Sequence, residues 1–373
     1  MAETCDVSTK HQAEYCRRLT MAAHKINERL PSGAQSRLRT LLLRTHQRLA
    51  RPPRLLLAGE FNSGKSLLAN LLIGESIVPT SIVPNSQFPV RFHFAPRPSL
   101  GAVLEGRSQN LAWSQLDHVA RSPVERIEVG LPLERLRKFE VIDTPGISSP
   151  LWKGEHFERQ LPLAHLPIWV TAASRAWRES ERQTWLRLSE TQRRRGLMLV
   201  TQIDLLPGSE DLALVLERLA TETADLFQSV IPMSLPDAIT SSVMGSERQS
   251  RDAWTKSGGA QLERALTSAL EEIAAQRVAS AKRALLRAIS RRRLQGASSA
   301  TAAWPKHLDE IASDLDLPPF ASSAPPTKER GDGRSSAGGG DHPNVADKAR
   351  DAAQRDGKGP YSRERGRIHQ RTT

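Results

Sequence analysis

One short segment constrains the fold more than any other part of this sequence. Gly59–Ser66 reads GEFNSGKS, which has the glycine, lysine and serine spacing of a phosphate-binding loop, or P-loop. The apolar run Leu55–Ala58 precedes it and the helical pattern Leu67–Leu72 follows it. A strand that turns through glycines into a helix directs backbone N–H groups and the positive end of the helix dipole toward an anion. The segment therefore predicts a site for a magnesium-bound nucleoside triphosphate.

Two later apolar segments end in acidic residues of the kind that such a site needs. Val141–Gly146 reads VIDTPG, in which Asp143 can hold Mg²⁺ through a water and the N–H of Gly146 can sense the γ-phosphate. Leu199–Asp204 reads LVTQID, and the carboxylate of Asp204 can accept two N–H groups from a guanine edge. Taken alone, these segments are also compatible with a plain turn and a helix cap. Their order after the P-loop favours the nucleotide-site interpretation.

The middle of the chain, about residues 53–240, alternates short apolar runs with helical patterns. Strands are expected at Leu55–Ala58, Arg126–Leu131, Phe139–Ile142, Ile168–Val170 and Leu197–Val200. Helices are expected at Arg178–Glu190 and Asp211–Phe227. This alternation predicts an α/β domain in which helices cover a mostly parallel sheet.

Helical patterns flank this middle region on both sides. Residues 1–52 carry two apolar stripes separated by Pro31–Gly33, and a similar stripe runs through residues 255–317. Each helix has one apolar face and no partner within its own segment, so the flanking helices are expected to pack together as a short bundle. Residues 318–373 contain few large apolar side chains, which predicts a disordered basic tail.

Composition narrows the environment of the protein. Lys and Arg number 53 and Asp and Glu 41, which gives a net charge of +12. No apolar run reaches the roughly 18 residues of a membrane-spanning helix, and acidic residues near the start argue against a secretion signal. The two cysteines, Cys5 and Cys16, exclude a disulfide framework. These features predict a soluble, basic protein of the reducing cytoplasm.

The motifs together resemble those of the bacterial dynamin-like GTPases. Gly59–Ser66, Asp143–Gly146 and Thr201–Asp204 are similar in order and spacing to GTPase motifs one, three and four, and Trp169–Ala173 is similar to a strand of that family. The resemblance covers about residues 50–240. It implies a domain that hydrolyses GTP to GDP with Mg²⁺ as cofactor, and flanking helices that form the neck bundle of such proteins.

The resemblance also implies a role for each matching residue. Lys65 and Ser66 bind phosphate and Mg²⁺, and Asp143 holds the metal through water. Ser86, aligned with the first switch, supplies a further hydroxyl to Mg²⁺, with Thr80 as the alternative. The residues expected to contact the nucleotide are Gly59, Asn62, Ser63, Gly64, Lys65, Ser66, Leu67, Gly146, Thr201, Gln202 and Asp204.

Asn62 stands at a P-loop position that helps to hold a monovalent cation in some relatives. Potassium is therefore a further expected cofactor, and Asn62 and Ser86 join Lys65 as expected catalytic residues. The alternative for Asn62 is a polar loop residue that bonds its own backbone.

The sequence departs from the family pattern where base recognition and hydrolysis are concerned. Thr201 and Gln202 stand where the fourth motif has Asn and Lys, which is expected to remove a base contact and a tether to the P-loop. Guanine recognition then depends mostly on Asp204. Ile147 stands where some GTPases have a water-positioning Gln. We therefore expect slow GTP turnover alone, and faster turnover in a homodimer formed through two GTPase domains. A P-loop ATPase is the less favoured alternative.

Positive charge collects in the flanking helices, at Arg37–Arg54 and Arg277–Arg293. Three interpretations stay open: a solvated helix face, attraction to an anionic membrane surface, and binding to RNA or the ribosome. The first hypothesis is thus a self-associating dynamin-like switch, peripheral at the inner membrane. The alternative is a regulatory GTPase associated with RNA or the ribosome.

Overall fold

The computed structural model describes residues 6–29, 32–75, 88–112, 124–149, 154–243, 247–296 and 304–317. The expected basic tail lies outside these residues, as do Thr80 and Ser86 of the expected first switch. No helix within the described ranges is both long and apolar enough to cross a membrane.

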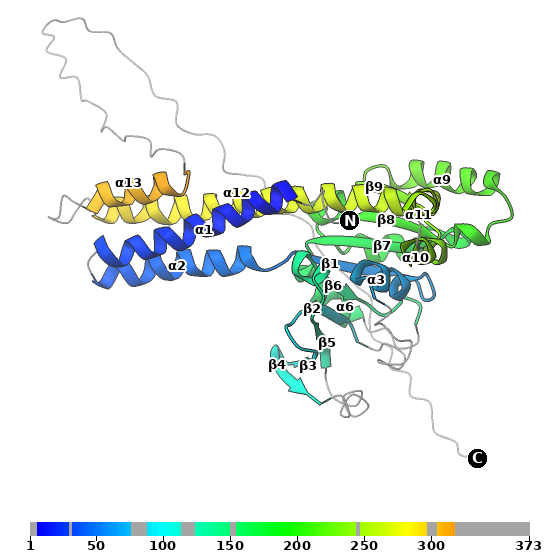
Figure 1. The fold of residues 1–373 in the computed structure, drawn as a ribbon, viewed down its shortest axis with the longest axis horizontal. Helices are drawn as coiled ribbons and strands as arrows, with labels where there is room; N and C mark the ends of the chain where they lie inside the picture. The colour runs from blue at the N-terminus through cyan, green and yellow to red at the C-terminus, as the bar shows by residue number, and fades with distance from the viewer. Residues whose placement is uncertain are drawn as a thin grey trace, which may run out of the picture. The chain divides into compact units, whose positions relative to one another are not determined.

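Nine strands of the described residues form one sheet (Figure 1). Its order is β4-β3-β5-β2-β6-β1-β7-β8-β9. The strands are β1 Arg54–Gly59, β2 Val90–Phe94, β3 Ser99–Leu104, β4 Arg107–Leu111, β5 Val124–Leu131, β6 Glu140–Asp143, β7 Leu166–Ala172, β8 Leu197–Thr201 and β9 Ser229–Pro232. Sequence periodicity predicts β1, β5, β6, β7 and β8, and it misses the other four.

The centre of the sheet is parallel and one side is mostly antiparallel. β1 runs parallel to β6 and β7, and β8 runs parallel to β7 and β9. β2 is antiparallel to β6, and β3 is antiparallel to β4 and β5. The predicted α/β class with a mostly parallel sheet is therefore confirmed. Because β6, β1, β7 and β8 point the same way, their carboxyl ends meet at one edge and their amino ends at the opposite edge.

Alternate side chains of β1 enter two separate cores. Leu55 and Leu57 pack on one face of the sheet, and Leu56 and Ala58 pack on the other, as the two-residue period of a strand requires. The helices with residues in the first core are α3 Lys65–Ile73, α5 Arg135–Lys138, α10 Leu235–Val243, α11 Glu247–Lys256 and α12 Gly259–Gly296. The helices with residues in the second core are α6 Gly154–Gln160, α7 Glu179–Trp185 and α9 Ser209–Thr223.

The single helix predicted for Arg178–Glu190 is wrong, because two helices occupy this part of the chain. α7 ends at Trp185, and α8 spans Glu190–Arg195. Ser189 caps α8, since its Oγ accepts a hydrogen bond from the backbone N–H of Gln192. Serine favours such a cap over a helix interior. The remaining short elements are η2 Leu161–Leu163, η3 Ala173–Arg175 and η4 Ile203–Leu205.

The flanking helices form the predicted bundle. α1 (Asp6–Arg29) and α2 (Ser32–Ala50) share one apolar core with α13 (Trp304–Asp314) and the second half of α12 (Figure 1). α12 is one continuous helix with two partners. Its first half contributes Leu262 and Leu266 to the core of the sheet, and its second half contributes Leu285 and Ile289 to the bundle. One rigid helix therefore joins the α/β domain to the bundle.

Candidate nucleotide-binding site

The P-loop leaves the carboxyl end of β1 and leads into α3, which begins at Lys65. Close packing requires glycine at two positions around it. A Cβ atom on Gly59, whose φ is +147°, would lie 1.9 Å from the carbonyl oxygen of Val170 in the neighbouring strand. A Cβ atom on Gly146 would lie 2.5 Å from the Cα atom of Phe61. The loop that follows β6 thus lies directly against the P-loop, as the expected γ-phosphate contact of Gly146 requires.

Lys65 is held under the P-loop. Its side chain is buried, and its Nζ donates a 2.6 Å hydrogen bond to the carbonyl oxygen of Glu60. Burial lowers the pKa of Lys65 to about 8, and the negative charges of Asp143 and Glu60 partly oppose this shift. A buried ammonium with so few partners is a strong point charge for phosphate oxygens.

Ser66 and Asp143 provide oxygen ligands for a divalent metal ion. The Oγ of Ser66 donates a 3.1 Å hydrogen bond to Oδ2 of Asp143, while Oδ1 of Asp143 is buried without a partner in the described structure. Burial raises the pKa of Asp143 to about 6, opposed by Lys65 and by the hydrogen bond from Ser66. A hydroxyl and a carboxylate are the hard oxygen donors that Mg²⁺ takes, usually together with substrate phosphates. These two residues therefore fit the expected metal.

The described residues contain no cluster of three or more His, Cys, Asp or Glu that could hold a metal ion.

The expectation that the fourth motif has lost its tether to the P-loop is wrong. Thr201, at the end of β8, is buried, and its Oγ1 donates a 2.7 Å hydrogen bond to the carbonyl oxygen of Ser63. The Nε2 of Gln202 donates a 2.9 Å hydrogen bond to the carbonyl oxygen of Asn62. The hydroxyl of Thr201 and the amide of Gln202 thus bond the end of β8 to the P-loop, where the family pattern has Asn and Lys. Both Asn62 and Gln202 have left-handed backbone angles, with φ of 58° and 59°.

Asp204 lies on η4, immediately after this tether, and it is exposed. Its neighbour Leu205 is 72% exposed. Since Thr201 and Gln202 fix the end of β8 to the P-loop, Asp204 lies at the same edge of the sheet as the phosphate-binding residues. This is where a base attached to a bound triphosphate can be contacted.

Arg175 is a candidate functional residue that sequence reasoning missed. It ends η3, the turn that follows β7, and its Nη2 donates a 3.0 Å hydrogen bond to the carbonyl oxygen of Phe61. Glu181 links the two segments that flank this turn. Its buried carboxylate accepts hydrogen bonds from Trp169 Nε1 and from the backbone N–H of Arg178. An arginine shortly after a strand that neighbours β1 is the available sequence signal, and it is a weak one.

Comparison with known proteins agrees with this geometry. A sequence model of the Dynamin family matches residues 55–203, the segment from β1 to η4. Residues 55–203, the dynamin-like region, are therefore similar to the dynamin family. The P-loop and the Asp143 loop lie within the matched residues, which end one residue before Asp204.

Curated relatives match parts of this chain. Isoniazid-induced protein IniC of Mycobacterium tuberculosis is 36% identical over 110 residues, which is 27% of this chain and 22% of that protein. Dynamin-like protein 2 of Campylobacter jejuni is 25% identical over 186 residues, which is 48% of this chain and 30% of that protein. The matches thus span less than a third of the length of these relatives.

A solved structure extends the likeness in fold. A chain described as part of an oligomerised bacterial dynamin pair superposes with a TM-score of 0.55 at 16% identity, covering 77% of this chain and 56% of its own length. At this identity the likeness concerns the fold. About three quarters of this chain therefore shares its fold with a chain of that bacterial dynamin pair.

Proposed function

We propose that this dynamin-like protein binds and hydrolyses GTP with Mg²⁺, and that it self-associates through its nucleotide-binding face. The observation that carries the proposal is the juxtaposition of Lys65, Ser66 and Asp143 at the carboxyl edge of the parallel strands, within the dynamin-family region. The charge and the oxygen donors of this group match a magnesium-bound triphosphate.

Each residue of the chain has a distinct part in this proposal. Lys65 places its positive charge on the β- and γ-phosphates, and Ser66 and Asp143 hold the metal. The N–H of Gly146 contacts the γ-phosphate, and Thr201 and Gln202 keep the base-binding segment fixed to the P-loop. The chemistry that Mg²⁺ supplies when bound is neutralisation of the charge that develops on the transferred phosphoryl group.

Slow hydrolysis by the single molecule stays part of the proposal. Ile147 is half-buried and packs against the core of the sheet, so it offers no polar group to a water. Asn62 is exposed on the P-loop, and its amide oxygen is the kind of ligand that a potassium ion takes. Arg175, bonded to the carbonyl oxygen of Phe61, lies close enough to the P-loop to position it.

Base preference gives the most direct test, in competition of GTP and ATP against a fluorescent GDP analogue. We expect GTP to compete better than ATP, because the Asp204 carboxylate accepts two N–H groups that adenine lacks. In Asp204→Asn we expect GTP affinity to fall about tenfold or more and xanthosine triphosphate to gain, because one acceptor becomes a donor. The matched control is Asp225→Asn, an exposed carboxylate before β9. Equal competition by ATP and GTP in the wild type would contradict a guanine-specific site.

Exposed apolar side chains support self-association across the nucleotide. Phe61, Leu67 and Leu205 are 52%, 46% and 72% exposed, and each is next to a residue of the nucleotide site. Large apolar side chains gathered on one face commonly mark a protein contact. A second copy of this chain is the expected occupant, in agreement with the structural neighbour being an oligomerised dynamin pair.

Leu205→Ser should separate self-association from nucleotide binding. In the wild type we expect GTP turnover per molecule to rise severalfold between nanomolar and tens of micromolar enzyme. In Leu205→Ser we expect this rise to disappear while GDP affinity stays within about threefold, because the change removes buried apolar contact area only in the dimer. Leu214→Ser is the matched control, since Leu214 on α9 is 65% exposed and is not one of the residues of the nucleotide site. Wild-type turnover that is independent of enzyme concentration would argue against the dimer.

Association with an anionic membrane surface completes the proposal. α12 exposes Arg283 and Arg287 on one side, four residues apart, and the structural neighbour is described as part of a pair that senses and tethers membranes. Basic residues near an anionic surface each contribute about 1 kcal/mol. Binding of the same arginines to RNA or the ribosome is the alternative that the sequence leaves open.

A further inference from the structure

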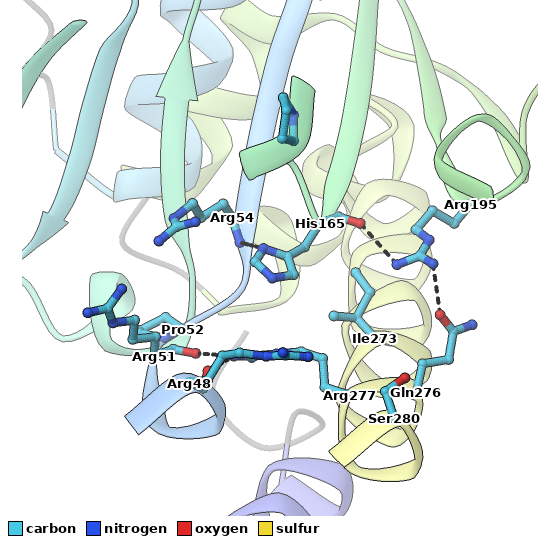
Figure 2. Close-up of a pocket in the computed structure, with 11 residues that line it drawn as sticks. Arg48, Arg51, Pro52, Arg54, His165, Arg195, Ile273, Gln276, Arg277 and Ser280 are labelled. Carbon is cyan, nitrogen blue, oxygen red and sulfur yellow. Dashed lines mark hydrogen bonds between the residues drawn. The ribbon is translucent and has the colours of Figure 1, made fainter. Parts of the chain in front are cut away.

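A basic cavity lies at the edge of the sheet opposite the nucleotide site. Its walls come from the end of α2, the amino ends of β1 and β7, the end of α8 and the middle of α12 (Figure 2). Its volume is about 420 Å³, which falls in the range of small-molecule sites and exceeds what a single small ion needs. The cavity thus lies where α12 passes from the sheet to the bundle.

Arginines dominate the lining of this cavity. They are Arg48, Arg51, Arg54, Arg195 and Arg277. Within the described residues, one ion pair offsets them, between Arg54 and Glu140 at 2.9 Å, and Glu140 also binds Arg91. Burial lowers the pKa of Arg195, and the nearby negative charge of Glu272 partly opposes this shift. The cavity therefore has a clear excess of positive charge.

The hydrogen bonds of Arg195 and Arg277 go to neutral oxygen atoms. The Nη2 of Arg277 donates to the carbonyl oxygens of Arg48 and Arg51 at 2.6 and 2.8 Å, while its Nη1 is buried without a partner in the described structure. The Nη2 of Arg195 donates to Oε1 of Gln276 at 2.8 Å. These contacts fix the two guanidinium groups at the cavity wall without neutralising them (Figure 2). A fixed, uncompensated guanidinium is a good ligand for phosphate.

His165 adds a neutral donor to this set. Burial and the positive charges of Arg277, Arg54 and Arg195 lower the pKa of His165 to about 4, so the imidazole is uncharged at neutral pH. Its Nδ1 accepts a 3.1 Å hydrogen bond from the backbone N–H of Arg54. The proton of the neutral ring is then on Nε2, which makes that atom a donor. Charged and neutral donors thus surround one cavity.

We propose that this cavity binds a small anion with two or more phosphate groups, at a site distinct from the nucleotide site. The shared chemistry fits a free oligophosphate and the phosphorylated headgroup of a lipid. Because Arg51 and Arg54 flank the start of β1 while Arg277 belongs to α12, the bound anion would link the α/β domain to the bundle. A ligand that binds only the assembled junction stabilises it by mass action.

Calorimetric titration with tripolyphosphate, without Mg²⁺, tests the site on the full chain. The informative variant is Arg48→Gln/Arg51→Gln, because both residues are exposed and only their backbone oxygens bond to Arg277. We expect its affinity to fall at least about tenfold, since two charge-assisted contacts are lost. Arg39→Gln/Arg44→Gln on the same helix is the matched control, with two exposed arginines outside the cavity.

Lys65→Ala separates this site from the P-loop, which also binds phosphates. In Lys65→Ala we expect tripolyphosphate to bind the arginine site with the same stoichiometry as at that site in the wild type. This expectation holds whether or not the proposed GTP binding is correct. Loss of all binding in Lys65→Ala, or an equal loss in the Arg39/Arg44 control, would overturn the proposal.

Flotation with vesicles identifies the source of the phosphates. Phosphatidylcholine vesicles with phosphatidylinositol 4,5-bisphosphate are compared with vesicles of equal charge that contain phosphatidylserine. Flotation that needs both the bisphosphate and Arg48/Arg51 supports a lipid headgroup, while tripolyphosphate binding without such flotation supports a free oligophosphate. If the wild type neither binds tripolyphosphate nor floats with either kind of vesicle, the arginines form no anion site.

Discussion

Lys65→Ala is expected to weaken binding of Mg²⁺·GDP and Mg²⁺·GTP by at least about a hundredfold and to abolish hydrolysis. Hydrogen bonds to charged groups contribute about 1.5–3 kcal/mol each, and the proposed role of Lys65 has it contacting two phosphates. Its burial under the P-loop strengthens the effect, because water screens its charge poorly there. Isothermal titration calorimetry with GDP gives the measurement.

The control for this variant has to separate folding from binding. Lys65 donates to the carbonyl oxygen of Glu60 and lies near the charge of Asp143, so its removal also changes the apo protein. Lys65→Met keeps most of the buried stem and should lose nucleotide affinity to the same extent while melting close to the wild type. Lys138→Ala, at an exposed lysine of α5, controls for loss of one positive charge. GDP affinity within threefold of wild type in Lys65→Met would contradict the proposed role.

The sequence predicts the part of the fold that is buried on both faces. β1, β7 and β8 are continuous apolar runs because helices cover both sides of them, so their pattern is visible without structure. β4 is mostly exposed and polar, and β9 is short and ends in Pro232, so neither carries a clear strand signal. β2, β3, β4 and β9 therefore come from the structure alone, whereas the sequence predicts β5 on the same side of the sheet as β3 and β4.

The sequence predicts only part of the candidate site as well. Gly59–Ser66 and Asp143 are recognisable because spacing along the chain fixes their chemistry. The tether from Thr201 to Ser63 and the contact from Arg175 to Phe61 depend on pairing between strands that are far apart in sequence. Residue types alone predict that Thr201 loses the tether, because they do not show that its hydroxyl reaches the carbonyl oxygen of Ser63. The basic cavity at the junction was equally hidden, since its arginines come from four elements.

Asp143→Asn is expected to weaken metal-dependent nucleotide binding and GTP turnover, and to stabilise the nucleotide-free protein. The amide is a poorer partner for Mg²⁺, and we expect metal-dependent GDP affinity and GTP turnover to fall roughly 10–100-fold. The carboxylate of Asp143 is buried, and its pKa is raised to about 6, so keeping it ionised at neutral pH costs up to about 3 kcal/mol. The amide avoids this cost but leaves one buried polar group unpaired, at about 1 kcal/mol. A net gain of about 1–2 kcal/mol in unfolding free energy should therefore appear in denaturant melts.

The pH dependence of this gain distinguishes a relieved charge from better packing. The pKa of Asp143 is higher in the folded protein than in the unfolded chain, so the folded state takes up a proton as the pH falls through about 6. This group therefore makes the wild type more stable at low pH, and its contribution is lost as the pH rises through that value. The advantage of Asp143→Asn should be largest near about pH 7.5 and shrink toward about pH 5. Asp252→Asn, an exposed site on α11, should show no such trend.

Metal binding requires the same negative charge of Asp143 that destabilises the nucleotide-free protein. A proton and Mg²⁺ compete for Asp143, so nucleotide affinity in the presence of Mg²⁺ should fall as the pH drops below about 6. Lys65 sets the opposite limit, because it loses its charge above about pH 8 in the nucleotide-free protein. Affinity should therefore be greatest between these two values. In Asp143→Asn the acidic limb should disappear, while the basic limb should stay and move to lower pH, because the charge of Asp143 no longer raises the pKa of Lys65. An acidic limb that persists unchanged in Asp143→Asn would show that another group controls metal binding.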